Sequence, residues 1–195
     1  MIKSKEHLLE YLESDRKALG RNGSPHFFDI VFKFERALRY YEYYKNCYNG
    51  SLYMKIMRKY YYWRFNTLSI LCGFTIYPNS FGKGLSIAHR GTIVVNQSAK
   101  IGENCRLHVG VNIGTIPGCS KVAPTIGDNV YIAPGVKIYG KISIANGIII
   151  GANSVVNKSF EEEDICIAGV PAQKISNLGR DKIIARNQNL YPDYI

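Results

Sequence analysis

The 195-residue sequence predicts an α+β protein, with a helical segment followed by a parallel β-helix and a short C-terminal tail. Before residue 73, apolar residues recur at helical spacing. From residue 76 onwards, a large apolar residue instead recurs every six residues, a period that fits neither a helix nor an antiparallel strand. We therefore expect a helical domain over 1–74, a β-helix over 75–178 and a tail over 179–195.

Three helices are expected in the first domain. Ser4 has a side chain suited to capping the first helix. Ser24 followed by proline is a favourable start for the second, and Gly73 is a natural stop for the third. The expected bounds are 4–20, 24–49 and about 51–72.

Nine of the fifteen tyrosines fall between Tyr40 and Tyr62, interleaved with basic residues. Because tyrosine is amphipathic, we expect these side chains to pack the helices together and to cover one end of the following domain. The alternative is a sugar-stacking or membrane-interface surface.

The six-residue period has two irregularities. Two extra residues enter between Ile87 and Val95, and the thirteen-residue step from Ile113 to Ile126 predicts an irregular loop over 114–125. Each hexad would supply one short strand and a turn, and three hexads would close one coil. The repeated residues would then stack inside the β-helix at about 4.8 Å, the usual strand spacing. They are Phe81, Ile87, Val95, Ile101, Leu107, Ile113, Ile126, Ile132, Ile138, Ile144 and Ile150.

Composition narrows the class of protein. The net charge of +10 is spread along the chain, and no nucleic-acid-binding motif accompanies it, so an anionic small molecule is the expected partner rather than nucleic acid. The five cysteines show no CxxC spacing, which indicates neither a disulfide framework nor a metal site. The N-terminus does not resemble a signal peptide, and no apolar run approaches the roughly 18 residues of a membrane span. We expect a cytoplasmic protein.

The repeats resemble those of the hexapeptide-repeat acyltransferases, and within them the serine O-acetyltransferases and related capsule and O-antigen O-acetyltransferases. The resemblance is carried by GLSIAHRGTIVV (84–95), AKIGENCRLHVGVNIGT (99–115), PTIGDNVYIAPGVKIYGKISIANGIIIGANSVV (124–156) and IAGVPAQKI (167–175). It implies a left-handed β-helix and acetyl-CoA as co-substrate, with no metal. It also implies a homotrimer, which the helical segment can enlarge to a hexamer, with active sites between subunits.

The resemblance also implies residue roles. His89 matches the general base, which takes the proton of the attacking hydroxyl. Gly114 is expected by position to donate a backbone N–H to the oxyanion. We expect His108, Arg90 and Asn112 to contact the acceptor, although simple packing accounts equally well for His108. Since His108 follows His89 by nineteen residues, one eighteen-residue coil plus one, it is expected to lie near His89, either within a subunit or across the interface.

Acetyl-CoA is expected to run along the β-helix corners. The expected cofactor-binding residues are Pro134, Gly135, Gly151, Ala152, Gly169 and Pro171, with Lys158 and Lys174 at the phosphates. Without the resemblance, a tight corner explains each glycine and a solvated surface explains each lysine.

Four positions depart from the serine acetyltransferase pattern. Ala88 replaces an acidic residue, Val122 a basic residue, Ala123 a second histidine and Thr75 the aspartate that orients the catalytic ring. Free serine is a zwitterion, and a selective pocket should pair both of its charges. We therefore expect the acceptor to be a sugar hydroxyl in surface polysaccharide biosynthesis. The alternatives are a serine O-acetyltransferase of cysteine biosynthesis and a non-catalytic trimeric β-helix scaffold.

Overall fold

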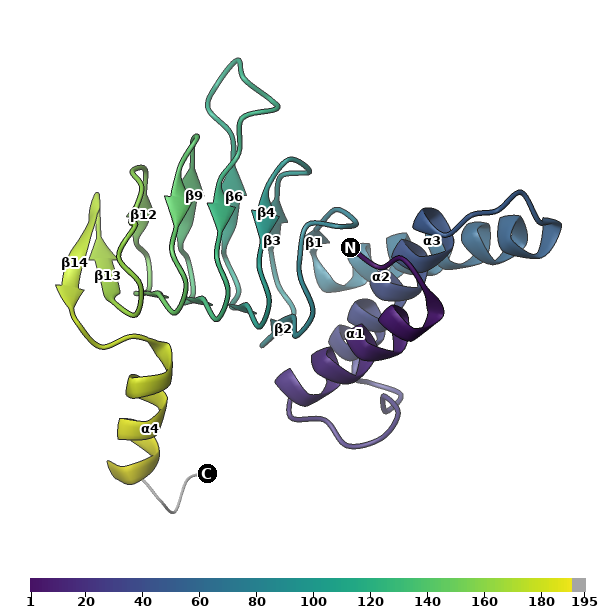
Figure 1. The fold of residues 1–195 in the computed structure, drawn as a ribbon, viewed down its shortest axis with the longest axis horizontal. Coiled ribbons are helices and arrows are strands. Elements are labelled where there is room, and N and C mark those ends of the chain that lie inside the picture. Colours follow the sequence, from purple (N-terminus) through teal and green to yellow (C-terminus); the bar gives the residue numbers. More distant parts are fainter. Residues whose placement is uncertain (191–195) are drawn as a thin grey trace.

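A computed structural model describes residues 1–190 of the chain, which form a helical unit joined end-on to a row of short strands (Figure 1). The helices of the unit are α1 (Lys5–Ala18), α2 (Ile30–Asn46) and α3 (Leu52–Cys72). The predicted cap of the first helix is confirmed, because the Ser4 hydroxyl accepts the backbone N–H of His7. The predicted third helix is also confirmed, and it ends at Gly73 with φ of 77°, a left-handed conformation that glycine adopts without strain.

The predicted start of the second helix was wrong. Helix α2 begins at Ile30, and its cap is Asp29, whose carboxylate accepts the backbone N–H of Phe32 at 3.2 Å. The same carboxylate pairs with Arg21 at 2.7 Å, which ties down the loop before the helix. Asp29, and not Ser24, therefore caps the second helix.

The strands wind into a left-handed parallel β-helix with three sheets, as predicted. One sheet contains β1 (Phe74–Thr75), β3 (Ile93–Val95), β6 (Asn112–Gly114), β9 (Lys137–Tyr139) and β12 (Val155–Val156). A second contains β4 (Lys100–Ile101), β7 (Thr125–Ile126) and β10 (Ser143–Ile144). The third contains β2 (Ser86–Ile87), β5 (Arg106–Leu107), β8 (Tyr131–Ile132), β11 (Ile149–Ile150), β13 (Cys166–Gly169) and β14 (Ala172–Ser176).

Strand register confirms the six-residue period and both irregularities. Ile132 pairs with Ile150, eighteen residues away, which is one regular coil. Ile87 pairs with Leu107 across twenty residues, which includes the two extra residues. Leu107 pairs with Ile132 across twenty-five, because the loop lies between them. All eleven repeated residues are buried, so the period marks the core.

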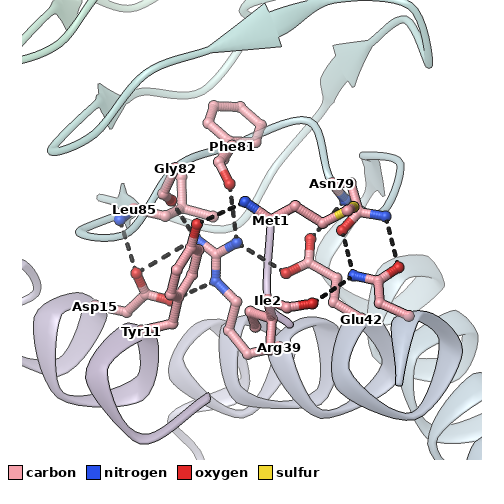
Figure 2. A network of polar contacts seen from close by, with 11 residues as sticks. Met1, Ile2, Tyr11, Asp15, Arg39, Glu42, Asn79, Phe81, Gly82 and Leu85 are labelled. Carbon is pink, nitrogen blue, oxygen red and sulfur yellow. Dashed lines mark hydrogen bonds and ion pairs between the residues drawn. The ribbon is translucent and has the colours of Figure 1, made fainter. Parts of the chain in front are cut away.

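Helices α1 and α2 close the first coil through a buried polar network (Figure 2). The Arg39 guanidinium, fully buried, donates to the carboxylates of Asp15 at 2.8 Å and Glu42 at 3.0 Å. It also donates to the carbonyl oxygens of Phe81 at 3.1 Å and Gly82 at 2.6 Å. One arginine therefore joins both helices to the backbone of the first coil.

Carboxylates of the two helices accept the N–H groups that the first coil would otherwise leave without partners. Asp15 accepts the N–H of Leu85 at 2.9 Å, and Glu35 accepts that of Ile87 at 2.9 Å. Side chains here take the place of a preceding β-helix coil.

The tyrosine-rich segment packs α2 against α3, as expected. Tyr61 stacks on Tyr40 with ring centroids 4.7 Å apart, and on Tyr44 at 5.4 Å. Tyr41 stacks on Phe65 at 5.6 Å. Other aromatic side chains of α3, however, remain exposed.

At the other end, β14 pairs antiparallel with β13. Residues 180–190, expected to be part of a tail, form α4 (Arg180–Leu190), and the rest of the expected tail, 191–195, lies outside the described residues. Within residues 1–190, no helix has the length and apolar character needed to cross a membrane.

Candidate active site

One edge of the β-helix brings together most of the residues predicted to be functional. It is the corner where each coil passes from the six-stranded sheet to the five-stranded sheet, and we call it the histidine edge. Backbone hydrogen bonds of 2.8–2.9 Å join the first coil to the end of α3 and each later coil to its neighbour, so the corner residues lie one above another. The donor and acceptor pairs are Gly91 to Cys72, Gly110 to Thr92, Gly135 to Val109 and Asn153 to Pro134.

His89 and His108 lie together on this edge. Their ring centroids are 6.3 Å apart, which confirms that the two histidines are neighbours. The reason differs from the one expected, because the coil that separates them has twenty residues, so His108 is level with Ala88. His89 is exposed to solvent, whereas His108 is half-buried.

His108 is held against Tyr131, with ring centroids 5.1 Å apart. Its Nε2 atom is buried and has no hydrogen-bond partner among residues 1–190. Burial lowers the pKa of His108, and the charges of Arg106 and His89 lower it further. The neutral imidazole is therefore the favoured form near pH 7.

Sequence reasoning missed Arg106 and Tyr131. Each directly precedes a buried residue of the repeat, Leu107 or Ile132, and neighbouring positions of a strand face opposite sides. Arg106 also donates to the Ser86 hydroxyl at 3.0 Å. Their place in the hexad could have identified them as outward-facing neighbours of His108.

Gly91 fixes the backbone next to His89. It has φ of 138°, and an added Cβ would lie 2.5 Å from Cγ2 of Val109. Only glycine fits both the conformation and the space. The turn that carries His89 is therefore set by the coil above it.

The predicted cofactor residues also lie along the histidine edge. Pro134 and Gly135 follow β8, and Gly151 and Ala152 follow β11, at successive levels of this corner. Gly169 joins them, because its N–H donates to the Ser154 hydroxyl at 3.1 Å. That hydroxyl donates in turn to the carbonyl oxygen of Gly151 at 2.7 Å. Pro171 follows in the turn between β13 and β14.

The two predicted phosphate-binding lysines lie near the last coil and already have polar partners. Lys158 donates to the Gln173 side chain at 2.7 Å, and Lys174 forms an ion pair with Glu162 at 2.5 Å. Both lysines are exposed, so these contacts can exchange with an anion at small cost.

Of the three remaining predicted residues, Arg90 lies on the histidine edge, Asn112 lies just beyond it and Gly114 lies at another corner. Arg90 is exposed directly after His89, and Asn112 is exposed at the start of β6, two residues after Gly110 of the edge. Gly114 ends β6 at the next corner, from which the loop after β6 projects (Figure 1). Gly114 therefore does not share the corner that carries His89.

Residues 1–190 contain no group of three or more His, Cys, Asp or Glu side chains that could hold a metal ion. The chemistry available at the histidine edge is that of two imidazoles, backbone amides and basic side chains.

Comparison with known proteins identifies the class of this fold. Residues 123–158 match the family described as bacterial transferase hexapeptide (six repeats). Within its parallel β-helix, the chain therefore contains the hexapeptide repeat of this family.

Among proteins of this type, the chain is similar to serine acetyltransferases. It is 39% identical over 110 residues to the serine acetyltransferase of Staphylococcus epidermidis, covering 55% of this chain and 51% of that protein. It is 37% identical over 110 residues to that of Staphylococcus xylosus, covering 50% of it. The chain thus matches only about half the length of these curated relatives.

Solved structures agree. The serine acetyltransferase of Brucella abortus superposes with a TM-score of 0.66 and 28% identity, over 89% of this chain and 69% of that one. The same protein in complex with coenzyme A superposes with a TM-score of 0.69 and 27% identity, over 90% and 70%.

Proposed function

We propose that the chain is an acetyl-CoA-dependent O-acetyltransferase that uses His89 as its general base. The observation that carries the proposal is the position of His89, exposed on the same edge as the backbone segments predicted to line acetyl-CoA. The similarity to serine acetyltransferases, one of them solved with coenzyme A, supports the same reaction.

The proposed reaction needs few groups. His89 takes the proton of the acceptor hydroxyl as its oxygen attacks the thioester carbonyl, and the carbon–sulfur bond then breaks. The proton passes to the departing coenzyme A thiolate, and the acetyl ester is released. Gly114 of a neighbouring copy would supply a backbone N–H to the oxyanion in a trimer with shared sites.

Acetyl-CoA would lie along the histidine edge. Coils joined in register present a straight row of backbone groups for an extended pantetheine chain. Lys158 and Lys174, at the end of this row, would meet the phosphates, with Lys174 exchanging its contact with Glu162 for the anion.

The comparisons support serine as the acceptor, in preference to the sugar hydroxyl expected from the sequence. The relatives and structures cited above are all serine acetyltransferases. As a serine acetyltransferase, the chain would act in cysteine biosynthesis.

A sugar hydroxyl is the second candidate, because of a specific observation. Ala88 and Ala123 are half-buried and offer no charge to a zwitterion. In addition, a groove of about 410 Å³ that includes Thr75 is lined by Tyr41, Tyr62 and Tyr77, apart from the corner of His89, where it could hold another part of a glycan. Aromatic faces of this kind suit a pyranose ring.

The test is acetyl-CoA turnover, followed by detection of the released thiol, with serine and a panel of free sugars offered separately. Turnover of serine alone would support the first acceptor, and turnover of a sugar alone the second. His89→Ala should abolish turnover with either, whereas His26→Ala, an exposed histidine in the loop before α2, should not. Unchanged turnover by His89→Ala would remove His89 from the mechanism, and absence of acetyl-CoA binding in calorimetry would favour the scaffold alternative.

A further inference from the structure

Helix α3 has two apolar faces, and only one of them is used within the described chain. The inner face carries Met54, Phe65, Leu68 and Cys72, which are buried against α2 and the first coil. On the outer face, Leu52 and Trp63 are each 71% exposed, and Ile70 is 81% exposed.

The outer residues form one stripe along the helix. Leu52, Ile56, Trp63 and Ile70 are spaced by four, seven and seven residues. At about 100° per residue, they fall within roughly 40° of one another, opposite the buried face. Figure 1 shows α2 and α3 extending away from the β-helix as a pair. We call this stripe, together with Lys55, Lys59 and Tyr60 beside it, the outer face of α3.

Only positive charges flank the outer face. Helix α3 contains Lys55, Arg58, Lys59 and Arg64 and no acidic residue. The acid-free region is much longer, because residues 43–102 contain eight Lys or Arg and no Asp or Glu. Within residues 1–190, none of the four basic side chains of α3 forms an ion pair, whereas Lys83 and Lys174 both do.

The positive charges beside the outer face indicate which kind of partner it binds. Two copies of α3 packed together by this face would bring Lys55 and Lys59 of both copies close together, without a compensating carboxylate on either helix. A surface of anionic lipid headgroups would instead neutralise these charges. Tyr60 and Trp63, aromatic side chains with a polar edge, are suited to the boundary between headgroups and acyl chains.

We propose that the outer face of α3 docks the protein on anionic membrane surfaces, with the helix lying in the plane of the interface. The apolar stripe enters the acyl boundary, and the flanking basic residues meet the headgroups. This inference goes beyond the proposed function and does not depend on it, because membrane binding is measured without acetyl transfer.

The fluorescence of Trp63 can report membrane binding without an added label. Trp63 is the only tryptophan and lies in the middle of the stripe. The experiment mixes the full chain with vesicles of phosphatidylcholine and phosphatidylglycerol (3:1), or of phosphatidylcholine alone, and records tryptophan emission and co-sedimentation. We expect a blue shift and at least tenfold tighter binding with phosphatidylglycerol, weakened in 0.5 M salt, since the attraction to headgroups is screened.

Matched variants locate the contact. Lys55→Glu with Lys59→Glu, or Ile56→Ser with Ile70→Ser, should weaken binding at least tenfold. Lys3→Glu with Lys5→Glu makes the same change of net charge at exposed positions of the N-terminal segment, and should have little effect. Circular dichroism and urea unfolding check that each variant is folded.

Three outcomes would overturn the proposal. One is equal or undetectable binding to both vesicle types. Another is an equal loss of binding in the Lys3/Lys5 control, which would mean that net charge alone matters. The third is a blue shift that needs no vesicles and grows with protein concentration, because it would assign the stripe to contacts between copies.

Discussion

The backbone N–H of Ile87, in the first coil of the β-helix, donates a 2.9 Å hydrogen bond to the carboxylate of Glu35 in α2. Glu35 is fully buried, and its second oxygen has no partner among residues 1–190. Burial, and then the nearby charge of Asp15, raise the pKa of Glu35 well above its ordinary value. Glu35 therefore favours its protonated form. It lies beneath β2, the strand that precedes His89.

This contact predicts how stability depends on pH. The folded state holds the Glu35 proton more tightly than the unfolded state, so this contribution to stability is lost as pH rises from 4.5 through the raised pKa. Glu35→Gln removes the titration, and its stability relative to the wild type should therefore be higher at pH 8 than at pH 5. Urea unfolding at the two pH values measures this. Glu161→Gln, at an exposed position, serves as the control, and an equal difference at both pH values would contradict the prediction.

Removing Asp15 should leave the positive charge of the buried Arg39 guanidinium balanced only by the carboxylate of Glu42. We expect Asp15→Ala to lower the free energy of unfolding by about 3–5 kcal/mol, the usual cost of breaking a buried ion pair from one side. Glu13→Ala removes the exposed ion pair with Arg16 and should change stability little. Similar losses in the two variants, measured by urea unfolding, would show that the buried network matters no more than a surface pair.

Gly91→Ala tests the turn that holds His89. We expect a loss of about 1–3 kcal/mol in the free energy of unfolding, from the strained φ and the contact with Val109. Adding Val109→Ala should restore part of the loss by removing the contact but not the strain. Gly50→Ala, where φ is 87° and the space is open, reports the strain alone. A Gly91→Ala loss no larger than that of Gly50→Ala would mean that the contact with Val109 is harmless.

The titration of His108 tests the electrostatics of the histidine edge. Because its pKa is lowered from 6.5, the folded state binds a proton less readily than the unfolded state, and the resulting loss of stability appears as pH falls below 6.5. Arg106→Gln should raise the pKa of His108 by removing a nearby positive charge. The ring C–H resonances of His108 in NMR give both values. A pKa that is unchanged in the variant would show that Arg106 has no part in lowering it.

Much of the fold could be predicted because the β-helix core repeats in sequence. Each of the residues from Phe81 to Ile150 in the six-residue series occupies the same inward position in its coil, so a single period specifies all of them. The loop after β6 was predicted for the same reason, since it interrupts the count between Ile113 and Ile126.

What escaped prediction depends on contacts between distant segments. Neither Arg39 nor Glu35 has a sequence pattern that indicates burial. Arg39 donates to a backbone carbonyl 43 residues further along the chain, and Glu35 accepts a backbone N–H 52 residues further along. The start of α2 was missed because two residues, Ser24 and Asp29, are both good caps, and the ion pair with Arg21 supports the second. The proximity of His89 and His108 was predicted, but their level in the coils required the observed register.

The polar side chains that close the first coil also limit what the β-helix can attach to. An uncovered end of a parallel β-helix presents a row of free backbone donors and acceptors, onto which the end of another molecule can add as a further coil. Asp15, Glu35 and Arg39 occupy those groups at one end, and the antiparallel strand β14 interrupts the parallel ladder at the other. Asp15, Glu35 and Arg39 hold the helices in place. They thereby also prevent β-helices of different molecules from stacking end to end into a fibre.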